Sequence, residues 1–267
     1  HPPLHCPCRA RTALAVADIE AIERATLDAV APQWVDELQD QAWLLPMDPG
    51  TVGRARSAVP LRHEAPGAAP TTLLQRIEAH YARRGFAVQL RVPDLPCFDA
   101  LAAAMAASGL RATKPTLTQT ASTRAMLVPG ASAPAPVEPV ADAGWTQVFL
   151  GPGFDLVDGA SPVQALSRAS GNLFASVREN GTTLAAGAIS FSHGWASVHG
   201  MRTVQSARGR GLAARVLAGL AQAALERGYE RVFLQVEAGN DPALALYRRA
   251  GFAPAWTYRY WQRPAPG

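Results

Sequence analysis

The sequence contains almost no lysine. Lys114 is its only one, and the rest of its basic charge comes from arginine. The formal net charge is +4 over 267 residues, and the arginines are scattered rather than gathered in one segment. Proteins that bind nucleic acid or an anionic membrane surface usually carry a dense basic patch. We therefore expect neither nucleic acid nor a membrane among the partners of this chain.

Cysteines and long apolar runs are scarce too. Cys6, Cys8 and Cys97 cannot make a paired disulfide framework, and Cys6-Pro7-Cys8 has no second cysteine or histidine pair to complete a zinc site. No apolar run reaches the roughly 20 residues that span a bilayer, and the first residues lack the pattern of a signal peptide. We expect a cytoplasmic protein with free thiols and no bound metal.

Apolar core material is plentiful, with 48% hydrophobic and 17% charged residues. The stretch 128–143 is rich in proline and small residues and has no apolar periodicity, so it is typical of a linker. This predicts an N-terminal domain over 1–127, a linker over 128–143 and a second domain over 144–267.

The second domain has the clearer secondary-structure pattern. Ser161-Pro162 is typical of a helix start, and Asn180-Gly181 of a tight hairpin turn. The predicted order is a helix, three antiparallel strands, a helix, a buried strand, a helix and an aromatic strand. The ranges are 161–171, 173–178, 184–191, 195–204, 212–227, 232–236, 241–251 and 257–262.

The first half contains a sequence pattern similar to one in the second half. Residues 84–92 resemble residues 227–236, and an alanine-rich helix that ends at Gly109-Leu110 or Gly251-Phe252 follows each. Strands are predicted upstream over 43–47 and 55–61, and a helix over 73–84. We interpret this similarity as an internal duplication.

The copies differ where a ligand would bind. The segment His63–Pro70 precedes the helix of the first copy and has one glycine and two prolines. Met105 stands where the second copy has Tyr247. We therefore interpret the first domain as a degenerate copy.

The most informative segment is Ala207–Ala214, a glycine-rich turn between a strand and a helix. The first N–H groups of a helix lack partners within the helix and lie at the positive end of its dipole, which suits a phosphate. Gly209 and Gly211 allow close backbone approach, while Arg208 and Arg210 add charge.

These motifs resemble those of the GNAT N-acetyltransferase superfamily. Its signature, Arg/Gln-x-x-Gly-x-Gly/Ala, corresponds to Arg208-Gly209-Arg210-Gly211-Leu212-Ala213, and Asn240, Leu246-Tyr247 and Gly251-Phe252 follow in the family's order. The resemblance implies an α/β (α+β) fold of two tandem GNAT-like domains, each a mixed, mostly antiparallel sheet flanked by helices.

One competing interpretation is a dinucleotide-binding turn. Gly209-x-Gly211-x-x-Ala214 fits that fingerprint. However, four residues (205–208) separate it from the strand, the preceding strands form an antiparallel meander, and Glu230 precedes the next strand instead of following it. We therefore favour the acetyltransferase.

The resemblance implies acetyl-CoA as the co-substrate. Backbone N–H groups from Arg208 through Ala213 would hold its pyrophosphate, with the Arg208 and Arg210 side chains nearby. The amides of Met201 and Thr203 match positions that bind the thioester carbonyl as a tetrahedral intermediate forms. Asn240 matches an asparagine that contacts pantetheine.

The resemblance also implies direct transfer of the acetyl group to an amine. Tyr247 matches the acid that protonates the leaving thiolate, although its helical face also suits a core aromatic. Glu237, His199 or solvent could take the proton of the amine. The acceptor could be a small-molecule amine or a peptide N-terminus, and a non-catalytic acyl-CoA sensor is the alternative. The oligomeric state is not predicted.

Overall fold

The computed structural model describes residues 14–127, 132–150, 163 and 166–267 of the chain. The helices are α1 (Val16–Val30), α2 (Pro70–Arg83), α3 (Asp99–Ala107), α4 (Ala143–Leu150), α6 (Leu212–Glu226) and α7 (Asp241–Arg249). Short 3₁₀ turns are η1 (Gly53–Ala55), η2 (Pro96–Phe98), η3 (Thr123–Met126) and η4 (Gln205–Ala207). The strands are β1 (Trp34–Leu38), β2 (Trp43–Met47), β3 (Val59–Pro60), β4 (Gln89–Pro93), β5 (Arg111–Ser122), β6 (Val137–Glu138), β7 (Leu173–Glu179), β8 (Thr182–Ser192), β9 (Trp195–Thr203), β10 (Arg231–Glu237) and β11 (Ala253–Gln262).

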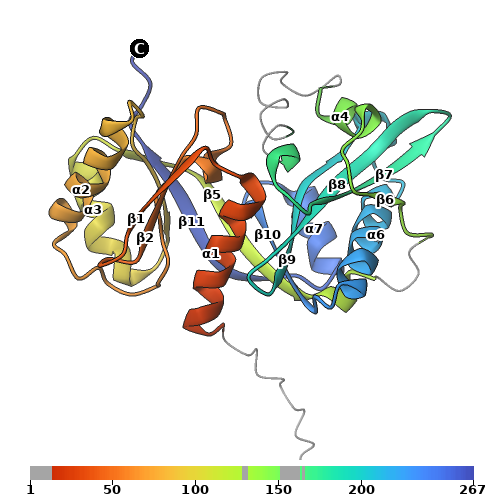
Figure 1. Ribbon diagram of the computed structural model, residues 1–267, viewed down its shortest axis with the longest axis horizontal. Coiled ribbons are helices and arrows are strands. Elements are labelled where there is room, and N and C mark those ends of the chain that lie inside the picture. Colours follow the sequence, from red (N-terminus) through yellow and green to blue (C-terminus); the bar gives the residue numbers. More distant parts are fainter. Residues whose placement is uncertain (1–13, 128–131, 151–162, 164–165) are drawn as a thin grey trace, which may run out of the picture.

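One eight-stranded sheet runs through both halves of the chain (Figure 1). Its order is β4-β11-β5-β10-β9-β8-β7-β6, and β9 and β10 are parallel while the other neighbours are antiparallel. A separate antiparallel sheet has the order β1-β2-β3. An isolated bridge from Ala58 to Leu90 links that region to β4. The predicted α/β class with mixed, mostly antiparallel sheets is confirmed.

The last strand crosses from the second half into the first. β11 lies between β4 and β5, antiparallel to both, and β5 also pairs with β10. The sheet is therefore continuous across the proposed domain boundary. The linker over 128–143 contains β6, which pairs with β7, and ends at the first residue of α4. The division into two domains stays a prediction.

Hydrophobic cores form on both sides of the molecule. In the second half, Leu212, Val216, Leu217 and Leu220 of α6 are buried against β7 to β10, as the helical periodicity predicts. In the first half, α2 and α3 pack with β2 and β4 around residues such as Ile77. A third cluster joins α1 to β9, β10 and β11.

Several elements differ from the sequence prediction. The strand expected over 55–61 is the end of a 3₁₀ turn followed by the two-residue β3, because a Gly-Arg-Ala turn and Pro60 interrupt the pattern. Helix α1 was not predicted, since its buried face carries Glu23 and several small residues. The twelve-residue β5 was also not predicted, because threonine and Pro115 mask its periodicity. Of the helix predicted over 161–171, residues 163 and 166–168 are helical, while 161–162 and 164–165 lie outside the described residues.

Candidate active site

The site is built on a local separation of β9 from β10. The two strands pair in parallel at Val232 with Ala196, Phe233 with Ser197 and Leu234 with Val198, and no pairing follows although both strands continue. A cavity of about 420 Å³ opens where they diverge. Its lining comes from both halves of the chain: Val30, Val52, Arg54, Thr116, Phe149, Leu166, Val198, His199, Gly200, Met201, Arg202, Gln235, Val236, Glu237, Asn240, Ala243, Tyr247, Tyr258 and Tyr260.

A β-bulge interrupts β9 at the cavity wall. The register against β8 changes from Ala186 opposite Arg202 to Ala188 opposite His199, so Gly200 and Met201 share one partner position. Gly200 has a φ of +59°, a left-handed conformation that glycine adopts easily. A bulge leaves backbone groups outside the regular ladder. Met201 therefore lies at a break in the ladder on the cavity wall, while Thr203 is not among the cavity-lining residues.

The glycine-rich turn has the expected form at the start of α6. Gly211 is the N-cap residue, with a φ of +74° and no side chain to cap the helix, and Gly209 has a φ of +79°. Apart from the chain neighbours, no described residue lies within 4 Å of where a Cβ on either glycine would be. The turn thus leaves the first N–H groups of α6 without a side-chain cap. This turn is not part of the cavity lining.

The side chains around this turn are already partly engaged. Arg210 forms an ion pair with Glu179 on β7, whereas Arg208 is exposed. Leu212 is buried in the core, so only its backbone is available to a phosphate. Ala213 follows it in the first turn of α6. The predicted phosphate contacts of this segment stay a prediction.

Tyr247 comes from α7 and reaches the cavity. Its side chain is 7% exposed and packs edge-on against Phe252, with 5.8 Å between the ring centres. Burial raises the pKa of Tyr247 to about 12, against a smaller opposing effect of Arg202. The phenol therefore keeps its proton over the physiological range, as a proton donor must. Tyr247 is at once a core aromatic and a cavity residue.

Glu237 is the last residue of β10, Asn240 is the N-cap of α7, and both line the cavity. The Asn240 side chain accepts a hydrogen bond from the Ala243 amide at 3.3 Å, so it caps α7. Burial lowers the pKa of Arg202, and the charge of Glu237 opposes that effect. Glu237 and Arg202 are therefore close enough for their charges to interact.

His199 lies in the cavity wall, 4% exposed, and both of its ring nitrogens are occupied. Nδ1 lies 3.1 Å from Arg54 Nη1, and Nε2 lies 2.7 Å from Ser197 Oγ. Because arginine can only donate, Nδ1 must accept, and the proton of the neutral ring is on Nε2. Burial, with a further effect of Arg54, lowers the pKa of His199 well below its usual value. His199 thus has no vacant lone pair for the proton of an amine.

The first half contributes residues that sequence reasoning missed. Arg54 lies in η1, directly before the segment predicted as a strand over 55–61, and no motif singled it out. Tyr258 and Tyr260 come from β11 in the second half, where an aromatic strand was predicted, and both line the cavity. Periodicity could not reveal these positions, because β11 and η1 meet only through the pairing of distant strands.

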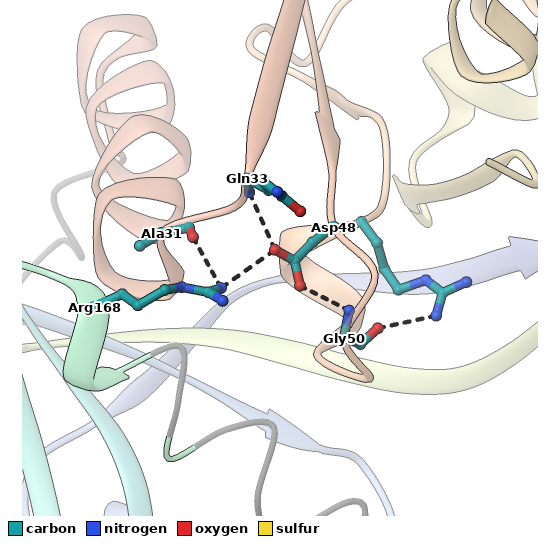
Figure 2. Close-up of polar contacts among 6 residues, drawn as sticks. Ala31, Gln33, Asp48, Gly50 and Arg168 are labelled. Carbon is teal, nitrogen blue, oxygen red and sulfur yellow. Dashed lines mark hydrogen bonds and ion pairs between the residues drawn. The ribbon is translucent and has the colours of Figure 1, made fainter. Parts of the chain in front are cut away.

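A polar cluster joins the two halves beside the cavity (Figure 2). Asp48 is 4% exposed and accepts hydrogen bonds from the amides of Gln33 at 3.1 Å and Gly50 at 2.9 Å. The Arg168 guanidinium donates to Asp48 at 3.2 Å and to the carbonyl of Ala31 at 3.1 Å. Val30 and Val52 flank this cluster and line the cavity.

Two features are absent from the part of the chain that the structure describes. No helix there is long and apolar enough to cross a bilayer. Within the same residues, no group of three or more histidine, cysteine, aspartate and glutamate side chains is arranged to hold a metal ion.

Comparison with known proteins gives a family match over most of the chain. Residues 16–261 match the family described as "Probable histone acetyltransferase Rv0428c C-terminal". A GCN5-related N-acetyltransferase from Kribbella flavida is similar in structure, with a TM-score of 0.66 and 22% identity over 96% of this chain and 97% of that chain. A tandem GNAT protein from the clavulanic acid biosynthesis pathway has a TM-score of 0.55 and 15% identity, over 95% and 98% of the two chains.

Curated relatives match over shorter segments. The mycothiol acetyltransferase of Corynebacterium aurimucosum is 43% identical over 56 residues, which is 21% of this chain and 18% of that protein. The chain thus matches less than a fifth of the length of the curated relatives reported.

Proposed function

Because this chain belongs to the family described as "Probable histone acetyltransferase Rv0428c C-terminal", within the GNAT N-acetyltransferase superfamily, we propose that it transfers the acetyl group of acetyl-CoA to an amine. The observation that carries this proposal is the cavity between the diverging ends of β9 and β10, with Tyr247 and Glu237 on its wall. An open strand pair of this kind admits an extended arm between two strands without breaking a formed ladder.

The residues present fit coenzyme A at both its diphosphate and its thioester. The uncapped start of α6, with Gly209 and Gly211 in left-handed conformations, suits the diphosphate. The bulge at Met201 supplies a backbone amide for the thioester carbonyl. Asn240 lines the cavity, and its side-chain oxygen caps α7. A contact with pantetheine would therefore use those atoms of its side-chain amide that take no part in the cap. When bound, acetyl-CoA supplies the activated acetyl group.

Tyr247 and Glu237 have distinct proton roles in this proposal. The amine nitrogen bonds to the acetyl carbon, and the carbon–sulfur bond breaks. The proton of the amine passes to Glu237, directly or through water, and Tyr247 Oη gives a proton to the departing sulfur before solvent restores it. Glu237 is preferred to His199 because both nitrogens of His199 are occupied by Arg54 and Ser197.

We also infer that the first half is a degenerate GNAT-like copy without cofactor chemistry. Its segment 63–70 has no glycine-rich turn. The His63 ring packs edge-on against Trp256 at 4.8 Å and Phe98 at 6.4 Å, so aromatic side chains fill the space beside that segment. Met105, in the position of Tyr247, is fully buried.

Titration calorimetry with acetyl-CoA, coenzyme A and NAD tests the cofactor, and a thiol-release assay across amines tests the reaction. We expect heat with acetyl-CoA and coenzyme A, none with NAD, and thiol release that depends on the amine. Binding of acetyl-CoA without turnover of any amine would favour an acyl-CoA sensor. Absence of heat with both forms of coenzyme A would refute the proposal.

A further inference from the structure

Arg54 is a cation at the cavity without an acidic partner. Its Nη1 donates to the neutral His199 ring, and it makes no ion pair within the described ranges. An arginine carries five N–H donors, and His199 accepts from one of them. The guanidinium is therefore free to bind an anion that enters the cavity.

The fold fixes Arg54 in this place from two sides. Ser197, 1% exposed, holds His199, which in turn holds the guanidinium. On the other side, Gly53 packs under the Tyr260 ring, where an added Cβ would lie 2.8 Å from Cε1. This close approach presses η1 against the cavity wall. A fixed guanidinium loses little freedom when it binds a planar anion.

The nearest buried acid does not neutralise Arg54. Glu23 is fully buried, and its carboxylate forms an ion pair with Arg91 at 2.6 Å, both side chains being 1% exposed. Burial raises the pKa of Glu23 despite the opposing effects of Arg91 and, more weakly, Arg54. Glu23, Arg91 and Arg54 together therefore carry a net positive charge. A buried net charge favours a ligand of opposite sign.

The remaining charged side chains around the cavity also favour an anionic ligand. Glu237 is the one carboxylate among the described lining residues, and its charge interacts with that of Arg202. Two cations and one anion thus line the space that an acceptor must enter. A histone tail, which is densely cationic, meets repulsion there.

We propose that Arg54 binds the carboxylate of the acceptor, so that the enzyme acetylates small amines that also carry a carboxylate. This assignment rests on the proposed acetyltransferase function. The acceptor amine then lies on the side of Glu237 and Tyr247. A cavity of about 420 Å³ suits an acceptor of amino-acid size next to the acetyl group. Arg54 is thereby a specificity residue supplied by the first half of the chain.

The test compares acceptors that differ only at the carboxylate. Thiol release is measured with the free amino acids, with their C-terminal amides and with a histone H3 tail peptide. For the best amino acid, we expect kcat/KM to exceed that of its amide by about 10- to 100-fold, the range for one charge-assisted hydrogen-bond pair. The H3 peptide should be the poorest acceptor.

Variants then assign the preference to Arg54. Arg54→Met should bring the kcat/KM for the amino acid close to that for its amide and leave the KM for acetyl-CoA unchanged. Arg54→Lys should keep part of the preference for the amino acid. Arg56→Met is the matched control, since Arg56 donates to the Gly50 carbonyl at 3.1 Å and does not line the cavity. It should retain the wild-type ratio, and thermal midpoints should show that all three variants fold.

The possible failures can be told apart. Equal turnover of acid and amide by the wild type, or preference for the H3 peptide, overturns the assignment of Arg54 and leaves the acetyltransferase intact. A ratio that survives in Arg54→Met also overturns it. Lack of turnover with every amine, together with lack of acetyl-CoA binding, refutes the proposed function itself.

Discussion

The Arg168 guanidinium lies 3.2 Å from the Asp48 carboxylate and ties the segment before β7 to the end of β2 (Figure 2). Asp48 is nearly buried and also accepts from two backbone amides. Asp48→Ala leaves these donors without an acceptor, which costs about 2–3 kcal/mol. Urea unfolding should record that loss. Asp40→Ala, which removes an exposed partner of Arg76, should leave the midpoint unchanged, and equal curves for the two variants would contradict the role of Asp48.

Removal of the phenol oxygen tests Tyr247. Tyr247→Phe keeps the packing against Phe252, so the calorimetric affinity for acetyl-CoA should be retained. Loss of the proton donor should lower kcat by about 100-fold or more. Since the pKa of Tyr247 is raised to about 12, its ionisation should produce no fall in wild-type activity below pH 10. Tyr229→Phe, which alters a ring packed at a tilt against Phe191, is the control and should keep full turnover. Unchanged turnover in Tyr247→Phe would remove the assignment.

The turn before α6 can be tested by adding a methyl group. Gly209→Ala and Gly211→Ala meet no neighbouring atom, but each forces a left-handed conformation on alanine at about 1 kcal/mol. Because the turn is proposed to hold the diphosphate, we expect the KM for acetyl-CoA to rise about 10-fold. Gly194→Ala is the matched control, with a φ of +77° in the turn between β8 and β9. It carries the same strain and should leave that KM unchanged.

Low pH should destabilise the protein, because a histidine that stays neutral in the folded state binds a proton in the unfolded chain. Burial lowers the pKa of His63 to about 4, whereas the unfolded chain keeps the usual 6.5. Only the unfolded state binds this proton between these values, so the contribution of His63 is complete above pH 6.5 and is lost as the pH falls towards 4. The loss amounts to about 2 kcal/mol after allowance for partial exposure. His199 acts in the same direction.

His63→Phe should flatten this pH dependence, measured as the free energy of unfolding by urea between pH 7 and pH 4.5. Phenylalanine keeps a ring between Phe98 and Trp256 and binds no proton. His193→Gln alters an exposed histidine and should retain the wild-type slope. A slope in His63→Phe as steep as that of the wild type would show that the acid sensitivity comes from elsewhere.

Local patterns predicted the second half of the fold well, because each element there carries its own signal. Asn180-Gly181 marks the turn between β7 and β8, and the apolar face of α6 follows from its periodicity. The neighbouring strand β10 was expected from its short apolar run. The family resemblance pointed to Tyr247, and Glu237 was named as a candidate base; both line the cavity, although their roles stay predictions.

Arg54 could not be found in this way. Its importance comes from a hydrogen bond to His199, 145 residues away in sequence, and from a positive charge that Glu23 and Arg91 leave uncompensated. The twelve-residue β5 was missed for a similar reason, since it pairs with β10 and β11 on its two sides and buries the polar residues Thr116 and Thr118. Features made by long-range pairing leave little trace in a local pattern.

The place of β11 between β4 and β5 sets an order of events during synthesis. A ribosome that has released only the first 130 residues has produced two strands whose shared neighbour does not yet exist. The edges of β4 and β5 that pair with β11 stay unpaired, exposed to solvent or chaperones, until residues 253–262 have left the exit tunnel. Assembly of the nascent chain is thus finished from its distal end, and the β4 edge of the large sheet joins β5 only after the last strand has been made.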